Sequence, residues 1–433
     1  MKSQFLIGAA NSGSGKTTLT IGLLKALANR GLNIQPFKCG PDYIDTKFHE
    51  AAASNPSVNL DLFLSSTEHV RHLYNKYATD KDVCIAEGVM GLYDGYDKMK
   101  GSSAEIARLL DIPVILVVNA KSMAYSAAAL IHGFKEFCPG IKVAGVIFNF
   151  VGSESHYSFL KDACNDVEVE PLGYLLKNQE IETPSRHLGL SLDGQSHFDD
   201  LANKIAGLVE KTVDIDRLLK ITSREINSPA NRPAEHATPN LNIAVARDAA
   251  FNFVYHENIE YLKRRGKVAF FSPLNDKELP ASDLLYLPGG YPELYPDELS
   301  RNKSMLESIR MYIENGGKTL AECGGMMYLS DSITDAEGRI YPMAGILGQM
   351  ATMQPMKLKL GYRQFRYNNV DIKGHEFHYS SIEKENKDLQ IDIEILNAKR
   401  QPAGTKLFRY KNLIAGYTHI YWAEMDNLLD LFK

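Results

Sequence analysis

The chain has 433 residues, of which 44% are hydrophobic and 23% are charged, a balance that predicts a soluble protein of two or three domains and excludes a disordered or fibrous chain. Its formal net charge is −5 and it has no block of like charges, so it lacks the electrostatic footprint of a protein that binds nucleic acid or an anionic membrane. No apolar run approaches the roughly 20 residues that a membrane-spanning helix needs.

The first half of the chain alternates short apolar runs with amphipathic stretches. The apolar stretch after Met1-Lys2 is too short for a signal peptide and predicts a first strand. Strands are expected at Gln4–Gly8, Asn33–Phe37, Asp82–Glu87, Pro113–Asn119 and Lys142–Asn149, and helices at Lys16–Arg30, Ser103–Leu110 and Ser122–Phe137. Runs such as Val114–Val118 are typical of strands buried on both faces, so the pattern predicts a parallel, doubly wound α/β sheet.

A glycine-rich loop, residues 9–18, separates the first expected strand from the first expected helix. Its glycines let backbone amides close around phosphate, and the helix N-terminus adds partial positive charge. Lys16 can reach the β- and γ-phosphates and the Thr17 hydroxyl can take a Mg²⁺ position, although Ala10 stands where the strict pattern has glycine. The loop predicts an ATP site made by Asn11, Gly13, Ser14, Gly15, Lys16, Thr17 and Thr18.

Two acidic clusters follow strands of the same predicted sheet, in residues 38–45 and 87–95. Ligands of such sheets bind beyond the carboxyl ends of the strands, so both clusters should face the phosphates. Glu87 can supply an oxygen to Mg²⁺, and Asp42, Asp45 and Asp94 can hold a second Mg²⁺ or orient a substrate. Surface turns also use Asp as a cap, so a structural role for any single carboxylate stays open.

A change in composition marks the middle of the chain. After a helical pattern over about Ser196–Leu219, the segment Ser223–Asn240 is polar and punctuated by prolines, which predicts a linker. The expected organisation is one domain over residues 1–222, a linker over 223–240 and a second domain over 241–433. That second α/β series has expected strands at Leu241–Ala246, Lys267–Phe271, Asp283–Leu287 and Lys318–Ala321, expected helices at Asn258–Arg265 and Met305–Asn315, and a β-rich segment over Ile340–Ile395.

Cys323 lies in a strand-turn-helix pattern over Lys318–Met327. Such an elbow places a nucleophile at the sheet edge near a helix N-terminus, which favours the thiolate. The amide of Gly324 can stabilise an oxyanion, and the loop around Gly290 can provide a second donor. The other four cysteines are scattered along the chain without CxxC spacing: Cys39, Cys84, Cys138 and Cys164. This pattern argues against disulfides and a structural zinc site, and it favours a reducing, cytoplasmic compartment.

A thiolate nucleophile needs a nearby base, typically histidine. His375, His378 and His419 lie downstream of Cys323, and sequence spacing alone does not choose among them. His375 and His378 also form an HxxH pair, but a metal site there is the weaker hypothesis because the segment is β-rich and contains no cysteine.

Together these motifs resemble the cobyrinate a,c-diamide synthase family over nearly the whole chain. The segments with this resemblance are Phe37–Asp45, Asn59–Asp61, Glu87–Gly95, Arg186–Leu190, Pro288–Glu293, Ala321–Gly325 and Gly374–Ser380. The resemblance implies a dethiobiotin-synthetase-like P-loop domain and a class I, triad-type glutaminase domain of flavodoxin-like α/β fold. It also implies that ATP with Mg²⁺ phosphorylates the c and a acetate groups of a corrin-type macrocycle, and that ammonia from glutamine then displaces the phosphate.

The resemblance also implies roles for single residues. Cys323 would be the glutaminase nucleophile and His419 its base, which leaves structural or substrate-adjacent roles to His375 and His378. In the first domain, the implied metal ligands are Thr17, Asp45 and Glu87, and the residues implied in substrate activation are Asp42, Tyr43 and Asp94.

The sequence departs from the family pattern in two places. Ala9-Ala10 replace the Gly-Thr of many relatives, which could alter one phosphate or base contact but leaves Lys16 in place. Tyr421 stands where the family commonly has a second histidine and generic glutaminases have a glutamate. The expectation is therefore a Cys323–His419 dyad, with the group that orients His419 unidentified.

Three alternatives compete with this interpretation. The first is the same diamidation of another tetrapyrrole, hydrogenobyrinate or nickel-sirohydrochlorin. The second is another glutamine-fed ligase, such as CTP synthase or cobyric acid synthase, which the segments at residues 40–45 and 290–293 disfavour. The third is a P-loop regulatory ATPase with a degenerate glutaminase module, which predicts a damaged cysteine elbow or a missing C-terminal histidine, whereas both are intact.

Overall fold

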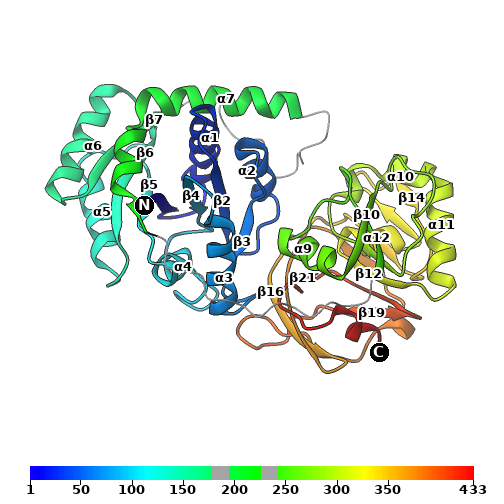
Figure 1. Cartoon of the computed structure of the whole chain (residues 1–433). Helices are drawn as coiled ribbons and strands as arrows, with labels where there is room; N and C mark the ends of the chain where they lie inside the picture. Colours follow the sequence, from blue (N-terminus) through cyan, green and yellow to red (C-terminus); the bar gives the residue numbers. More distant parts are fainter. Residues whose placement is uncertain (178–194, 226–240) are drawn as a thin grey trace. The chain divides into compact units, whose positions relative to one another are not determined.

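The computed structural model describes residues 1–177, 195–225 and 241–433, and the chain divides into two compact units, Met1–Pro233 and Ala234–Lys433 (Figure 1). The sequence segment Arg186–Leu190 and most of the predicted linker lie outside the described residues. The domain boundaries read from the sequence therefore remain predictions. In the part of the chain that the structure describes, no helix is long and apolar enough to cross a membrane.

The first unit is built on one sheet with the strand order β3-β2-β4-β1-β5-β6-β7, all parallel, and a short β8 that pairs antiparallel with β1. Its strands are β1 (Lys2–Ala9), β2 (Ile34–Cys39), β3 (Val58–Leu60), β4 (Val83–Glu87), β5 (Val114–Asn119), β6 (Val143–Val151), β7 (Glu170–Leu176) and β8 (Ser223–Arg224). Its helices are α1 (Lys16–Asn29), α2 (Asp45–Ala53), α3 (Thr67–Ala78), α4 (Ser103–Leu110), α5 (Ala127–Glu136), α6 (Glu154–Asp166), α7 (Gln195–Thr212) and α8 (Ile215–Ile221).

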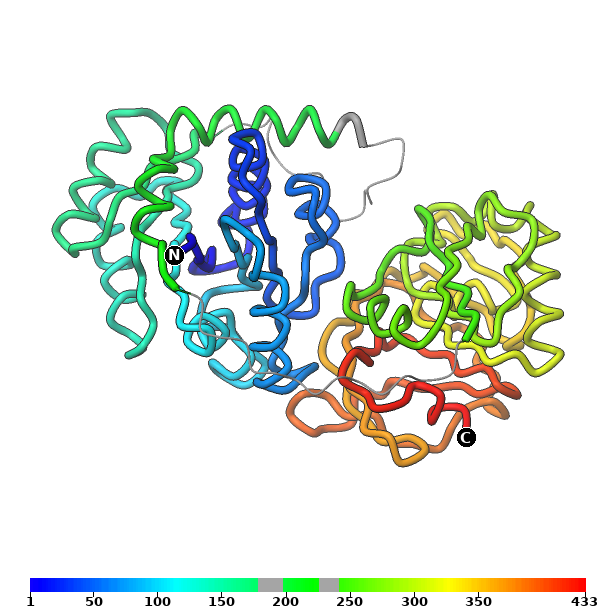
Figure 2. The backbone as a smooth tube through the Cα atoms, in the orientation of Figure 1, coloured from blue at the N-terminus to red at the C-terminus, as the bar shows by residue number. Residues whose placement is uncertain are grey.

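Helices cover both faces of this sheet, which confirms the doubly wound architecture. Along β1, Leu6 packs into a core with α3 to α6, while Phe5 and Ile7 point to the opposite core with α1, α2, α7 and α8. Helix α7 lies across α1 (Figures 1 and 2), and the contact requires Gly22, where a Cβ atom would stand 2.6 Å from Cγ2 of Ile205. The sheet is therefore buried on both sides and exposes its functional groups at the ends of its strands.

One predicted helix is wrong. The pattern over Ser196–Leu219 forms two helices, α7 and α8, because the chain leaves the helical path between them. Val213 forms a β-bridge with Gly173, and the Asp214 side chain then caps α8 by accepting the backbone amide of Arg217 at 2.9 Å.

The second unit has a six-stranded sheet with the order β10-β9-β11-β12-β20-β19, parallel except for β19. Two smaller sheets follow the orders β14-β13-β15-β18 and β16-β17-β21. The strands are β9 (Leu241–Ala246), β10 (Gly266–Phe271), β11 (Leu284–Leu287), β12 (Lys318–Glu322), β13 (Ser332–Thr334), β14 (Ile340–Pro342), β15 (Met350–Thr352), β16 (Lys359–Tyr367), β17 (Val370–His378), β18 (Ser381–Lys384), β19 (Leu407–Tyr410), β20 (Leu413–Gly416) and β21 (His419–Ile420). The helices are α9 (His256–Arg265), α10 (Pro296–Arg301), α11 (Lys303–Glu314) and α12 (Gly324–Leu329), with short 3₁₀ turns η3 (Pro292–Leu294), η4 (Lys387–Leu389) and η5 (Leu428–Phe432).

The register of the second unit brings distant segments to one place. Glu322 at the end of β12 pairs with Gly416 at the end of β20, and the backbone amide of Cys323 donates to the Gly416 carbonyl at 2.7 Å. On the neighbouring sheet, His375 of β17 lies directly opposite His419 of β21. The cysteine elbow after β12 and the C-terminal histidine segment after β20 therefore start side by side, where these two paired strands end.

Candidate active sites

The phosphate-binding loop of the first unit joins β1 to α1, as the sequence predicts. Gly13 and Gly15 take positive φ angles of 76° and 89°, which residues with a Cβ atom rarely adopt. A Cβ atom on Gly15 would stand only 1.9 Å from Nδ2 of Asn149, and that amide donates to the Ser14 carbonyl at 3.0 Å. Ser14 in turn donates to Oδ1 of Asn11 at 2.5 Å, so the loop is held closed on one side by β6 and on the other by its own side chains.

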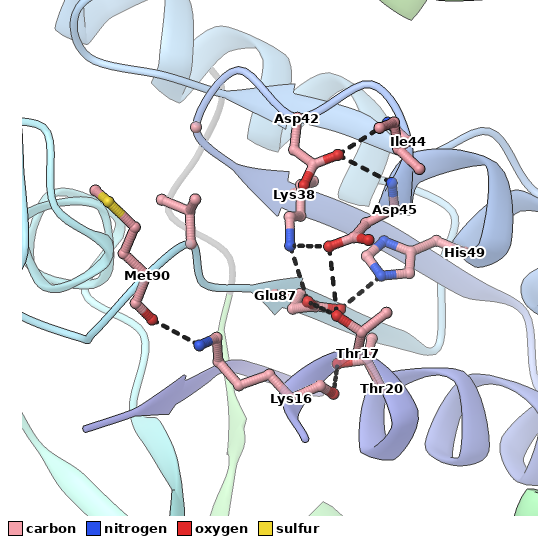
Figure 3. Close-up of polar contacts among 12 residues, drawn as sticks. Lys16, Thr17, Thr20, Lys38, Asp42, Ile44, Asp45, His49, Glu87 and Met90 are labelled. Atoms are coloured by element: carbon pink, nitrogen blue, oxygen red, sulfur yellow. Dashed lines mark hydrogen bonds and ion pairs between the residues drawn. The ribbon is translucent and has the colours of Figure 1, made fainter. Parts of the chain in front are cut away.

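Lys16 opens α1, followed in the same helical turn by Thr17 and Thr18. The Lys16 ammonium donates to the carbonyl oxygen of Met90 at 2.6 Å (Figure 3). It also donates to the carbonyl oxygen of Asn11 at 3.3 Å. Lys16 thus connects the phosphate-binding loop to the segment after β4, at the sheet edge where nucleotide phosphates bind in folds of this kind.

A buried ionic cluster lies beside this loop, at the carboxyl ends of β2 and β4 (Figure 3). The Lys38 ammonium lies 2.7 Å from Oδ2 of Asp45 and 2.8 Å from Oε1 of Glu87. The Thr17 hydroxyl donates to the same two carboxylate oxygens, at 3.3 and 2.8 Å. His49 contacts the other Glu87 oxygen, with 2.7 Å between Nε2 and Oε2. The structure therefore brings together the three predicted metal ligands, Thr17, Asp45 and Glu87.

The pKa values of this cluster shift in different directions, because each group is buried among charged neighbours. Burial alone would raise the pKa of Glu87, but the charges of Lys38 and His49 hold it below its usual range. Burial would lower the pKa of Lys38, yet the charges of Asp45, Glu87 and Asp42 raise it, so the ammonium stays protonated. Burial and the charge of Asp42 raise the pKa of Asp45, because a single ammonium does not neutralise three acids.

This donor set fits Mg²⁺. Hard oxygens from one hydroxyl and two carboxylates converge around a positive charge, and Mg²⁺ prefers oxygen ligands, with one or two carboxylates and substrate phosphates. Within the described residues, no group of three or more His, Cys, Asp or Glu side chains could hold a metal ion alone.

The three predicted substrate-activating residues lie in the loops after β2 and β4. Oδ1 of Asp42 accepts the backbone amides of Ile44 and Asp45, at 2.8 and 2.9 Å, and Oδ2 of Asp94 accepts that of Gly91 at 3.1 Å. Both aspartates therefore have the loop-stabilising contacts that the sequence left open as an alternative. Tyr43 follows Asp42 in the loop before α2, and its side chain is buried. A role of any of the three in substrate activation stays a prediction.

Two members of the ionic cluster were not predicted as site residues. Lys38 lies in the segment Phe37–Asp45, and the signal that could have identified it is a lysine between the buried residues Phe37 and Cys39 of β2. His49 lies four residues after Asp45 on α2, so the two side chains share one helix face. No helix was predicted at these residues, and without α2 the four-residue spacing does not place the two side chains together.

The second unit contains the predicted cysteine elbow. Cys323 joins β12 to α12 with φ 48° and ψ −105°, a strained conformation typical of a nucleophile at a sharp strand-to-helix turn. The turn needs glycine after it, because a Cβ atom on Gly325 would stand 2.2 Å from the carbonyl oxygen of Leu287. The elbow therefore packs directly against the end of β11, where the predicted second donor loop begins.

The loop after β11 lies between the elbow and the histidine. An added Cβ on Gly324 would stand 3.1 Å from the backbone nitrogen of Gly290, so the two predicted oxyanion donors are neighbours. One residue earlier, an added Cβ on Gly289 would stand 2.1 Å from Cε1 of His419. Cys323, His419, Gly290 and Gly324 are thus assembled around one short glycine loop.

The resting elbow does not favour the thiolate, so that expectation is wrong. Burial and the charge of Glu293 raise the pKa of the Cys323 thiol well above its usual value, and the Gly324 amide offsets only part of this. Burial, His375 and His378 lower the pKa of His419 to about 3. A base that is to remove the proton of a thiol during attack must itself be neutral and the thiol protonated, and these pKa shifts favour both states.

His375 and His378 lie close to His419 but have other contacts. His375 faces His419 across the β17–β21 pair. His378 stacks on Tyr417, with 3.7 Å between ring centroids, and its Nδ1 lies 2.8 Å from the Ser380 carbonyl oxygen. Glu376 between them is paired with Arg363 at 2.7 Å.

Comparison with known proteins gives two family matches and many full-length relatives. Residues 5–190 match the family described as the CobQ/CobB/MinD/ParA nucleotide binding domain, and residues 242–427 match the CobB/CobQ-like glutamine amidotransferase domain. The chain is 41% identical to the cobyrinate a,c-diamide synthase of Caldanaerobacter subterraneus subsp. tengcongensis, over 96% of this chain and 94% of that protein. It is 40% identical to the protein of the same name from Picrophilus torridus, over 99% and 98% of the two chains. It is 41% identical to that of Methanocaldococcus jannaschii, over 87% and 86%.

Proposed function

The chain belongs to the cobyrinate a,c-diamide synthase family, and we propose that it converts the a and c acetate carboxylates of cobyrinate to amides, using ATP and glutamine. One observation supports this most strongly. A phosphate-binding loop with its buried acidic cluster and an intact cysteine elbow with its histidine occur in two units of one chain. This pairing is what an enzyme needs if it activates a carboxylate and also makes the ammonia that replaces the activated oxygen.

In the first unit, the loop amides and Lys16 bind the phosphates of ATP, and Thr17, Asp45 and Glu87 would hold Mg²⁺. Bound Mg²⁺ would neutralise charge on the β- and γ-phosphates. The substrate carboxylate attacks the γ-phosphorus, the bond to the ADP oxygen breaks, and an acyl phosphate forms. Lys38 stays protonated in this site and can stabilise the charge that moves onto the transferred phosphoryl group. Asp42, Tyr43 and Asp94 would orient the carboxylate.

In the second unit, His419 removes the proton of Cys323 as the sulfur attacks the side-chain carbonyl carbon of glutamine. The amides of Gly290 and Gly324 stabilise the oxyanion. The proton on His419 passes to the leaving ammonia, and a water molecule then hydrolyses the thioester to release glutamate and the free thiol. Ammonia attacks the acyl phosphate, phosphate leaves and an amide remains. A second cycle on the other acetate gives the diamide.

We place this chemistry in the cytoplasm. All five cysteines are free thiols in the described structure, and the nucleophile must stay reduced to react. ATP and glutamine are also supplied there.

The test of the two-site proposal is Cys323→Ala. Glutamine-dependent amidation should be lost, while a high concentration of ammonia should restore amide formation, because the first unit does not use the cysteine. Equal loss with both nitrogen sources would contradict the division of the reaction between the two units.

A further inference from the structure

Glu322 connects the cysteine elbow to the histidine strand. It is the last residue of β12, directly before Cys323, and only 2% of its surface is exposed. Its Oε1 accepts the backbone amide of Ile420, the residue after His419, at 3.0 Å. Its Oε2 lies 4.0 Å from Nδ1 of His419. One carboxylate therefore contacts the strand that holds His419 and faces one of its ring nitrogens.

The surroundings of Glu322 hold this arrangement in place. The Tyr286 hydroxyl donates to Oε2 of Glu322 at 2.7 Å, and the Tyr286 ring packs edge-on against Trp422, with 4.7 Å between centroids. The side chain of Asn258 binds the backbone after His419 with two hydrogen bonds. Its Nδ2 donates to the Ile420 carbonyl at 2.8 Å, and its Oδ1 accepts the Trp422 amide at 3.0 Å. Hydrogen bonds of this kind restrict both the carboxylate and the histidine backbone.

We infer that Glu322 is the positioning residue that orients His419, so that the glutaminase uses a Cys323–His419–Glu322 triad; the inference rests on the proposed glutaminase function. The position where generic glutaminases have a glutamate is Tyr421 here, and its ring packs against Tyr255 with 5.5 Å between centroids. The carboxylate instead comes from the residue before the nucleophile. This arrangement answers the question that the sequence left open.

The chemistry of the site requires such a group. When His419 takes the proton of Cys323 it becomes an imidazolium that is 1% exposed, and an unpaired buried charge is costly. The separation of 4.0 Å is longer than a hydrogen bond, but catalytic hydrogen bonds are often long in the free enzyme and tighten in the reacting complex. Burial raises the pKa of Glu322 to about 8, against the effects of Tyr286 and Ile420, so a positive charge on His419 would stabilise its ionised form.

Other groups near His419 do not take this place. His375 and His378 are bases, and their charges oppose an imidazolium on His419. Glu376 also acts on His419 electrostatically, but it is paired with Arg363 at 2.7 Å and accepts the Thr418 hydroxyl at 3.1 Å. Glu376 is therefore committed to its own pair, and Glu322 is the carboxylate positioned at Nδ1.

The experiment compares Glu322→Gln with Tyr286→Phe in the full chain. Glu322→Gln keeps the shape of the side chain and an acceptor for the Ile420 amide but removes the negative charge. Tyr286→Phe removes one hydrogen bond to the same carboxylate and keeps the charge. For each protein we would measure amidation with glutamine, amidation with ammonia, the rate at which iodoacetamide alkylates Cys323, and the thermal unfolding temperature.

Glu322→Gln should lower kcat with glutamine by about 100-fold or more, as expected for loss of the orienting member of a triad. KM for glutamine and the ammonia-dependent rate should stay within about threefold of the wild type, and alkylation of Cys323 should slow. Tyr286→Phe keeps the charge of Glu322 and its bond to the Ile420 amide, so it should lower the glutamine-dependent kcat less than Glu322→Gln does. Unchanged glutamine turnover in Glu322→Gln would overturn the inference.

Two further outcomes separate the possibilities. If Glu322→Gln also unfolds at a lower temperature than the wild type, the deciding variant is Glu322→Asp, which keeps a carboxylate. Recovery of glutamine turnover in Glu322→Asp supports the positioning role, and no recovery overturns it. A wild-type enzyme that is inactive with glutamine would contradict the proposed function instead. The alkylation rates of Cys323 would still test whether Glu322 acts on the Cys323–His419 pair.

Discussion

Gly289 lies directly against the imidazole of His419, because a Cβ atom at position 289 would stand 2.1 Å from Cε1 of that ring. Its carbonyl oxygen accepts the backbone amide of Phe253 at 3.0 Å, so the loop is tied to the chain after β9 and has little freedom to move away. The position of His419, the proposed base, therefore depends on the absence of a single methyl group at position 289.

Gly289→Ala should displace His419 and lower glutamine-dependent amidation by about tenfold or more, since misplacement of a catalytic group by about 1 Å can cost 100-fold. Amidation with ammonia should be unchanged. The matched control is Gly207→Ala on α7, where nothing lies within 4 Å of the added Cβ and where alanine favours the helix. Equal activity of both variants with glutamine would contradict the contact.

The phosphate-binding loop offers a similar pair of glycines. Gly15→Ala should raise the KM for ATP by about 100-fold or abolish activity, because its Cβ would overlap Nδ2 of Asn149 at 1.9 Å and its φ is 89°. Gly13→Ala has the same backbone strain, with φ 76°, but nothing within 4 Å of its Cβ, and should cost less. ATP titrations of both variants with ammonia as nitrogen source measure the difference. Similar KM values would show that strain, rather than Asn149, determines the effect.

Lys38→Met should destabilise the first unit by about 3–5 kcal/mol, because it leaves Asp45 and Glu87 buried without their shared cation. Trp422, the single tryptophan, lies in the second unit, so the urea unfolding transition followed by its fluorescence should match that of the wild type. The transition of the first unit, followed by circular dichroism, should shift to a lower urea concentration. The control Lys25→Met, at a surface pair 3.7 Å from Asp199, should change stability by less than about 1 kcal/mol. A loss below about 1 kcal/mol for Lys38→Met would contradict the role of Lys38 in this cluster.

The lowered pKa of Glu376 predicts that the stability of the second unit depends on pH. Burial would raise its pKa, but His378 and Arg363 lower it from the ordinary 4.5 to about 2. A carboxyl group with a lowered folded pKa contributes stability that is fully present above pH 4.5 and is lost as the pH falls through about 2. This difference, 4.5 − 2, or about 2.5 pH units, is worth about 3 kcal/mol.

Glu376→Gln should therefore weaken the second unit by about 3 kcal/mol near neutral pH, and its difference from the wild type should narrow as the pH falls from about 4.5 toward 2. Urea unfolding followed by Trp422 fluorescence at several pH values measures this. A difference that stays constant over that range would mean that the loss does not come from the ionised carboxylate.

Much of this molecule could be predicted from local sequence patterns. The strands β1, β4, β5, β9 and β12 follow from short apolar runs, and the elbow at Cys323 follows from the glycines directly after the β12 run. The predicted long helix at 196–219 was wrong because its periodicity is continuous, while the break depends on the bridge from Val213 to Gly173. Such tertiary pairing leaves no periodic signal in the segment itself.

The same limit applies to the sites. Lys38 and His49 contact Glu87, which is 49 and 38 positions away in sequence, and Glu322 contacts Ile420, which is 98 positions away. His49 also lies on α2, a helix that was not predicted. The thiolate expected at Cys323 was also wrong, because an elbow motif indicates a nucleophile but says nothing about how deeply the sulfur is buried. Motifs predict which residues react, whereas burial shifts the pKa values of those residues.

The most direct test of the central claim is a mass measurement on the product. The wild-type enzyme is incubated with ATP, Mg²⁺, glutamine and, in separate reactions, cobyrinate, hydrogenobyrinate or nickel-sirohydrochlorin. The proposed function predicts two carboxyl-to-amide conversions on cobyrinate, dependent on both ATP and glutamine, and none on the other two macrocycles. Amidation of a different macrocycle alone would contradict the substrate, and amidation of none would contradict the proposed function.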